Sequence, residues 1–257
     1  MFASVLVALA GHIEGRDALV LAAQLADDDA PIVVAHVMGT SAAPLTGGTD
    51  AAARRRAGLR DASGDVYATL GPDPRVHYLP VSGMPFADAV EALARRERPD
   101  VIVVGQNMLA GESGMARLIA DASCPIIVAP YGHRFVRGFA PARITVACAP
   151  AGPIDEAVAL AGALAERVGA DVRLIAAGDD AAAEAWLAHA QGQAPAAAAT
   201  RVAGRGAGAL VAQTRGDVDV MVIAGRDDEI LRQAACPVLV VPAAASVAPQ
   251  VDAQARR

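Results

Sequence analysis

The chain has few aromatic residues, few cysteines and no long apolar run. Aromatic residues make up 3% of its 257 residues although hydrophobic residues make up 54%, so we expect cores of aliphatic side chains and alanine. Charge or glycine interrupts the apolar segments well before the ~18 residues that a membrane-spanning helix needs. The N-terminal segment lacks a basic start and predicts a strand rather than a secretion signal. We therefore expect a cytoplasmic protein with no membrane partner.

Basic residues are also fewer than acidic residues, 22 against 28. The net charge of −6 argues against a general nucleic-acid binder, which would carry a basic face. The three cysteines, Cys124, Cys148 and Cys236, are far apart and match no zinc or redox spacing. We interpret them as reduced thiols that pack as small apolar groups.

The segment from residue 100 to residue 130 carries the clearest structural signal. Residues 100–105 (DVIVVG) and 124–130 (CPIIVAP) are short runs rich in Val and Ile, typical of strands buried on both faces of a parallel sheet. A glycine-bearing loop and a helical segment at 115–122 lie between them, which predicts a right-handed crossover unit. Ligands bind beyond the carboxyl ends of such strands, so the candidate site lies at residues 105–113.

The same pattern recurs at residues 219–225 (DVMVIAG) and 236–242 (CPVLVVP), which indicates a duplicated domain. Strands and helices alternate along both halves, so we predict an α/β fold with two tandem, doubly wound parallel-sheet domains of Rossmann-like type. Domain 1 is expected at 1–138 and domain 2 at 139–243, with a disordered tail at 244–257. We interpret residues 131–141 as the linker and the Ala/Pro-rich residues 193–200 as a loop.

Several of these features together resemble the universal stress protein family in its tandem form, over residues 3–243. The resemblance rests on the first strand and helix, the His-Val pair at 36–37, the helix entry at 82–88, and the runs at 100–105 and 122–128. It implies a fold like that of the adenine nucleotide alpha hydrolases and a stress-response or regulatory role without enzymatic activity. Protomers of that family pair through their fifth strands. The resemblance therefore implies that residues 125–130 and 237–242 pair within this chain as an intramolecular pseudo-dimer, and it leaves room for a homo-oligomer through other surfaces.

Family members that bind ATP carry an aspartate after the first strand and a glycine-rich loop after the fourth. In this sequence Ala10-Gly11-His12 stands where the family has Asp-Gly-Ser, so Ala10 takes the aspartate position. Met108 stands at a loop glycine position, and Glu112 precedes Ser113 where a Gly-Ser pair is expected. A carboxylate about 4 Å from a phosphate costs up to ~4 kcal/mol at an effective dielectric near 20. The N-terminus of a helix contributes only roughly 0.3–1 kcal/mol. The nucleotide motif is therefore degenerate, and we expect no bound ATP or other cofactor.

Domain 1 nevertheless retains a candidate pocket at the ends of its strands and in the loops that follow them. Its residues are Ala10, Gly11, His12, Val37, Gly105, Gly111 and Ser113. The alternative interpretation is a weak binder of ATP or another adenine nucleotide through this pocket. A third hypothesis, a nucleotidyl-transferring enzyme, rests on a partial His-x-Gly-His pattern at residues 12–15 that lacks its second histidine.

The remaining expectations concern His12, His36, Ser113 and the second domain. His12 has no further ligand at metal spacing, so we expect no metal site, and His36 lies inside a strand and is interpreted as a satisfied core residue. Ser113 has a second interpretation as the N-cap of the following helix. In domain 2, Ala149 stands where the aspartate would be, and Gly225 runs almost directly into the next helix. We expect no phosphate site there.

Overall fold

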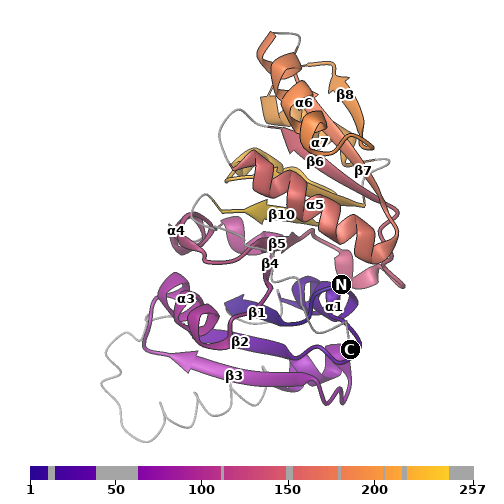
Figure 1. Ribbon diagram of the computed structural model, residues 1–257. Helices are drawn as coiled ribbons and strands as arrows, with labels where there is room; N and C mark the ends of the chain where they lie inside the picture. Colours follow the sequence, from indigo (N-terminus) through magenta and orange to yellow (C-terminus); the bar gives the residue numbers. More distant parts are fainter. Residues whose placement is uncertain are drawn as a thin grey trace, which may run out of the picture.

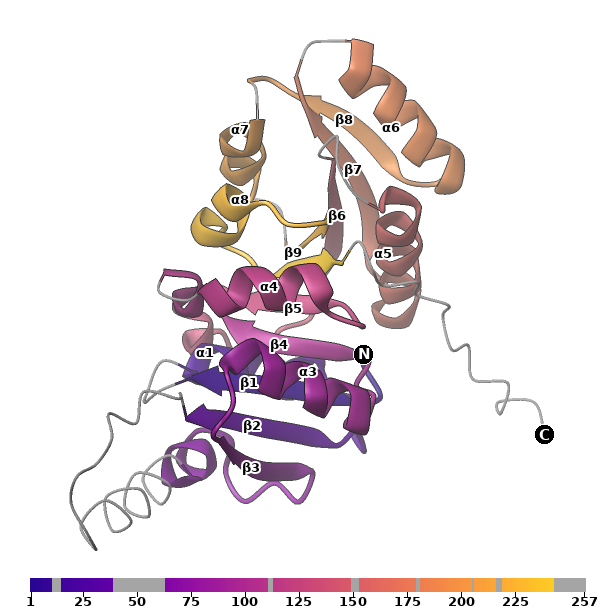
Figure 2. The same cartoon turned by 90° about the vertical axis from the view of Figure 1, so that its left-hand side faces the viewer.

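The computed structural model describes residues 1–10, 15–38, 63–110, 113–148, 153–178, 181–204, 206–215 and 219–242. Ten strands form one continuous sheet in the order β3-β2-β1-β4-β5-β10-β9-β6-β7-β8. The strands are β1 (Val5–Ala10), β2 (Ile32–Met38), β3 (Val76–Ser82), β4 (Val101–Gly105), β5 (Ile126–Ala129), β6 (Arg143–Cys148), β7 (Asp171–Ala177), β8 (Ala198–Val202), β9 (Val220–Ala224) and β10 (Val238–Val241). Figure 2 shows them stacked from β3 at the bottom to β8 at the top.

Helices connect the strands within each half of the chain. The α-helices with defined bounds are α1 (Arg16–Leu25), α3 (Phe86–Glu97), α4 (Ser113–Asp121), α5 (Ile154–Val168), α6 (Ala181–Gln193), α7 (Gly206–Gln213) and α8 (Asp228–Gln233). Two short 3-10 helices, η1 (Gln106–Ala110) and η2 (His133–Phe135), follow β4 and β5. Residues 63–70 are also helical.

The sheet consists of two five-stranded parallel halves that meet along β5 and β10. All neighbouring strands within each half run parallel, whereas β5 and β10 run antiparallel, with Val128 opposite Val238. The strand order of the second half is the order of the first half reversed, as expected for two copies related by a two-fold rotation. The α/β, Rossmann-like fold class is therefore confirmed, while the domain boundary at 138/139 stays a prediction. The tail at 244–257 lies outside the described residues.

The helices cover the two faces of the sheet and enclose an aliphatic core on each. Helices α1, α5 and α6 pack on one face, and α3, α4, α7 and α8 pack on the other. Figure 1 shows α3 and α4 on one side of the sheet and α1 and α5 on the other. Both β5 and β10 are buried along their whole length, because each has helices on both faces and a strand on both sides.

The repeated aspartate before β4 and β9 has the same structural role in both halves. One carboxylate oxygen of Asp100 accepts hydrogen bonds from the backbone N–H groups of Ala3 (2.7 Å) and Ser4 (3.1 Å). Asp219 does the same for Ala142 (2.8 Å) and Arg143 (2.9 Å). Each aspartate thus fixes the start of the neighbouring strand, β1 or β6, and supplies a hydrogen-bond acceptor to two backbone donors there.

The Ala/Pro-rich segment differs from the sequence-based expectation. Residues 193–200 were expected to form a loop, but Ala198–Val202 forms the edge strand β8, which pairs in parallel with β7. Four of its five residues are exposed, so its side chains carry none of the Val/Ile pattern of a buried strand. The expectation was wrong because an edge strand depends on backbone pairing with its neighbour more than on its own residues.

Candidate functional site

The carboxyl ends of β1, β2 and β4 form the edge at which the sequence places its candidate pocket. Ala10, the last residue of β1, is paired in register with Val37 of β2, and both side chains belong to the face covered by α3 and α4. Gly105 ends β4, which pairs with β1 on its other side. The structure therefore places Ala10 beside Val37 and Gly105 on the adjacent strand end. This arrangement presents a methyl group and a valine at the edge, with no carboxylate from either strand.

The other candidate residues can be placed only in part. Gly11, His12 and Gly111 lie outside the described residues, as does Glu112. Ser113 is the first residue of α4, at the helix start where the sequence predicted an N-cap. The candidate pocket as a whole stays a prediction.

The segment after β4 folds as the 3-10 helix η1, which uses its side chains to build the core. Met108, at the position where the family resemblance led us to expect a loop glycine, is 7% exposed and packs in the core on the α3 and α4 face. A glycine-rich loop binds phosphate because its backbone N–H groups can approach the anion without a side chain in the way. A buried methionine has the opposite effect, since it ties this backbone to the core.

Gln106, the first residue of η1, joins the two halves of the molecule. Its side-chain nitrogen donates hydrogen bonds to the backbone oxygens of Leu231 (3.0 Å) and Ala234 (3.1 Å) at the end of α8. Its side-chain oxygen accepts a hydrogen bond from the backbone N–H of Tyr131 (3.0 Å). The carbonyls at a helix end lack partners within the helix, so Gln106 satisfies two of them. This role could not be read from the sequence, because the carbonyl partners on α8 lie 125 and 128 residues away along the chain.

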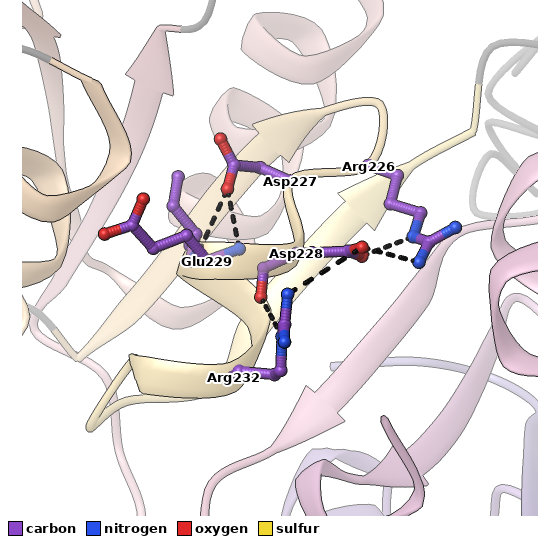
Figure 3. Close-up of polar contacts among 6 residues, drawn as sticks. Arg226, Asp227, Asp228, Glu229 and Arg232 are labelled. Carbon is purple, nitrogen blue, oxygen red and sulfur yellow. Dashed lines mark hydrogen bonds and ion pairs between the residues drawn. The ribbon is translucent and has the colours of Figure 1, made fainter. Parts of the chain in front are cut away.

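The corresponding edge of the second half ends in a helix that is capped by its own residues. Gly225 follows β9 with φ of 77°, and α8 begins at Asp228. The Asp227 carboxylate accepts hydrogen bonds from the backbone N–H groups of Glu229 and Ile230, both at 3.0 Å, as an N-cap does. Figure 3 shows this carboxylate over the first turn of α8. The donors that would otherwise face an anion are bound within the protein.

Further carboxylates in the first turn of α8 add negative charge at the same place. Asp228 binds Arg226 through two contacts, of 2.5 and 2.7 Å, and its backbone oxygen accepts a hydrogen bond from Arg232 (2.9 Å). Asp228 and Glu229 both lie in the first helical turn. Figure 3 shows Arg226 and Arg232 both directed towards Asp228. Two cations and three carboxylates leave a net negative charge, so these residues do not fit the phosphates of a nucleotide.

The expectation for His36 is confirmed. The expectation for the cysteines is confirmed for Cys124 and Cys236, whereas the Cys148 side chain lies outside what the structure describes. His36 is 3% exposed, and its Nδ1 lies 2.9 Å from the Tyr78 hydroxyl. Burial raises the pKa of the Tyr78 hydroxyl above its ordinary value. Burial also raises the pKa of the Cys124 and Cys236 thiols to about 12, so both remain protonated and unreactive at neutral pH.

Asp17 was not singled out from the sequence, yet it anchors the linker. It lies in the first turn of α1 and is 5% exposed. Its carboxylate accepts hydrogen bonds from the backbone N–H groups of Gly132 (3.1 Å) and Arg134 (2.7 Å), and from the Arg134 guanidinium (3.1 Å). Gln24, also on α1, holds the ring of buried His133 at 2.8 Å. The linker is therefore fixed on α1 beside the candidate edge.

The sequence of the first half of the chain matches a known protein family. A model of the universal stress protein family matches residues 1–130. The chain belongs to this family. No curated protein matches its sequence significantly.

Solved structures extend the likeness of this universal stress protein to both halves of the chain. A universal stress protein from Archaeoglobus fulgidus DSM 4304 superposes with a TM-score of 0.66 at 14% identity, covering 93% of this chain and 96% of that one. The functionally unknown protein PA1789 from Pseudomonas aeruginosa PAO1 gives 0.54 at 14% identity over 95% and 93%. The cytoplasmic domain of a prokaryotic cation chloride cotransporter gives 0.54 at 12% identity over 95% and 97%. At these identities the likeness concerns the fold.

None of the described helices is long and apolar enough to cross a membrane. Within the same residues, no group of three or more His, Cys, Asp or Glu side chains is arranged to hold a metal ion.

Proposed function

We propose that this universal stress protein is a non-enzymatic regulatory protein whose nucleotide sites are degenerate and do not bind ATP. The observation that carries the proposal is the cap of α8, where Asp227 takes the backbone donors of the helix start and Asp228 and Glu229 add charge of the wrong sign. In domain 1, Met108 and Gln106 support the same conclusion, because their side chains are used for the core and for the contact between halves.

The pairing of β5 with β10 supports a further part of the proposal. In the tandem chain each half covers the apolar edge strand of the other, with Ile127 opposite Leu239. An exposed edge of this composition would invite aggregation. The two halves would then act as one regulatory unit, an intramolecular pseudo-dimer that needs no second chain to cover these strands.

The alternative, weak adenine-nucleotide binding through domain 1, keeps one point in its favour. Helix α4 follows η1 in the chain after β4 and has no acidic residue in its first turn. An ATP site there would have to form around Ala10 and Val37 without the carboxylate that the family places after the first strand.

Whether the purified protein carries bound adenine nucleotide distinguishes the proposed function from the alternative. The full chain, purified without added nucleotide, is denatured, and the supernatant is analysed by absorbance and mass spectrometry. The proposal expects no stoichiometric adenine nucleotide. Recovery of about one nucleotide per chain would contradict it, and the same measurement on Gly105→Val would then show whether the nucleotide was held at the domain 1 edge.

A further inference from the structure

Aromatic side chains are scarce in this chain, yet two of them are exposed within one short turn of the linker. Tyr131 is 79% exposed and Phe135 is 75% exposed, and the adjacent Val136 is 41% exposed. Aromatic residues make up 3% of the sequence, and exposing two of them side by side forgoes apolar burial that each could supply in a core. A local cluster of exposed apolar side chains is typical of a binding surface.

The turn that presents these rings is held on both sides by hydrogen bonds. The Asp17 carboxylate binds the backbone N–H groups of Gly132 and Arg134, and Gln106 binds the N–H of Tyr131. Gly132 has φ of 88°, which a residue with a side chain rarely adopts. The rings are therefore displayed by a fixed backbone. Such preorganisation lowers the entropy that binding would otherwise cost.

Arg134 lies between the two rings. Its guanidinium carbon is 5.4 Å from the centre of the Tyr131 ring and 4.8 Å from the centre of the Phe135 ring. Both distances are within the range of a cation–π interaction. Tyr, Phe and Arg are the residues that protein interfaces favour, and Tyr and Arg are frequent hot spots. We call this surface, made of Tyr131, Arg134, Phe135, Val136 and Arg137, the linker patch.

The charge around the linker patch indicates the chemistry of its occupant. Residues 122–154 contain no Asp or Glu, but they contain Arg134, Arg137 and Arg143. Arg137 is exposed. Among the described residues, the Asp17 carboxylate contacts the patch through its ion pair with Arg134, and Asp17 is buried. Because Asp17 neutralises Arg134, the positive charge of the patch comes from the exposed Arg137. In a chain whose net charge is −6, this makes the patch complementary to an acidic segment.

We propose that the linker patch docks an acidic, partly apolar segment of another protein, with an apolar side chain on the two rings and carboxylates near Arg137. A symmetric contact with a second copy would bring the two Arg137 side chains together, which is unfavourable. Nucleic acid is disfavoured because binding it requires several cations, whereas Arg134 is neutralised by Asp17. The inference goes beyond the proposed function and does not depend on nucleotide binding.

The test first selects peptides that bind the protein and then measures their affinities for the wild type and for variants of the linker patch. A random dodecapeptide phage library is panned against the immobilised full chain, and enriched sequences are made as fluorescein-labelled peptides for anisotropy titrations. Phe135→Ser and Arg137→Ser alter exposed positions, and their melting temperatures are compared with that of the wild type. Tyr67→Ser, at a 47% exposed aromatic outside the linker, is the matched control.

The proposal expects enriched peptides to combine Asp or Glu with a large apolar residue. Their affinity should fall about ten-fold or more in Phe135→Ser and Arg137→Ser, fall with added salt, and stay unchanged in Tyr67→Ser. No enrichment, enrichment of neutral or basic peptides, or equal binding by all variants would overturn it. Concentration-dependent dimerisation that Phe135→Ser abolishes would assign the patch to a second copy instead. Displacement of the peptides by single-stranded RNA or by phosphatidylserine vesicles at similar concentrations would likewise contradict a protein partner.

Discussion

A lysine at Val128 would test whether β5 is an interior strand of this molecule. Val128 is 1% exposed and lies opposite Val238, in the core under α4 and α8. Removing a fully buried valine costs ~1.5–3 kcal/mol, and an unpaired buried ammonium adds several kcal/mol more. We expect Val128→Lys to lower the free energy of unfolding by about 4 kcal/mol or more, which is a large share of the ~5–15 kcal/mol of a typical protein.

The assay is urea unfolding followed by circular dichroism, with light scattering to measure the particle mass. Thr200→Lys, at an exposed position in the edge strand β8, serves as the control and should change stability by less than about 0.5 kcal/mol. If Val128→Lys fails to fold, Val128→Thr is measured instead. This change replaces a buried methyl group with a hydroxyl and should lower the free energy of unfolding by about 1–3 kcal/mol. An unchanged unfolding midpoint with a halved particle mass would refute the reasoning, because β5 would then pair with another chain.

Three further predictions concern single side chains. Thr145 is fully buried and its hydroxyl has no hydrogen-bond partner among the described residues, so Thr145→Val should raise the free energy of unfolding by about 1 kcal/mol in urea titrations; a loss of stability would mean that the hydroxyl has a partner. Asp100→Ala and Asp219→Ala each remove two hydrogen bonds to backbone N–H groups and should each cost about 1–2 kcal/mol, with additive effects in the double variant because the two sites are distant. Burial lowers the pKa of the His133 imidazole below its ordinary 6.5, so the unfolded chain takes up a proton first and stability should decline as pH falls below about 6.5. His133→Gln should show a smaller decline, measured as the melting temperature between pH 8 and pH 5, and an equal decline would assign the effect to other groups.

The strands and their order could largely be predicted, because buried parallel strands leave a strong signal. The runs at 101–105 and 220–224 are nearly all Val, Ile or Met, and their repetition indicated a duplication that the structure displays as two five-stranded halves. The recurrent aspartate before them was part of that signal. Its role as an acceptor for the backbone of β1 or β6 was not, because the aspartate and its partners are 76 or more residues apart in the chain.

The remaining features depend on contacts between distant segments. Ala198–Val202 forms a strand because β7 offers it a free edge, and its own alanines do not indicate this. Gln106 and Asp17 are single polar residues with no motif around them, and their partners are backbone groups of α8 and the linker. At the candidate site, the residues alone suggested a degenerate nucleotide motif, which stays a prediction, whereas the α8 cap required three-dimensional information.

Titration calorimetry of the full chain with Mg-ATP tests the central claim most directly. The capped start of α8 and the use of Gln106 and Met108 within the fold lead us to expect a dissociation constant no tighter than millimolar, about −4 kcal/mol. The titration should therefore give only the heat of dilution up to a few hundred micromolar ligand. A saturable isotherm with a micromolar constant and one site per chain would contradict the account.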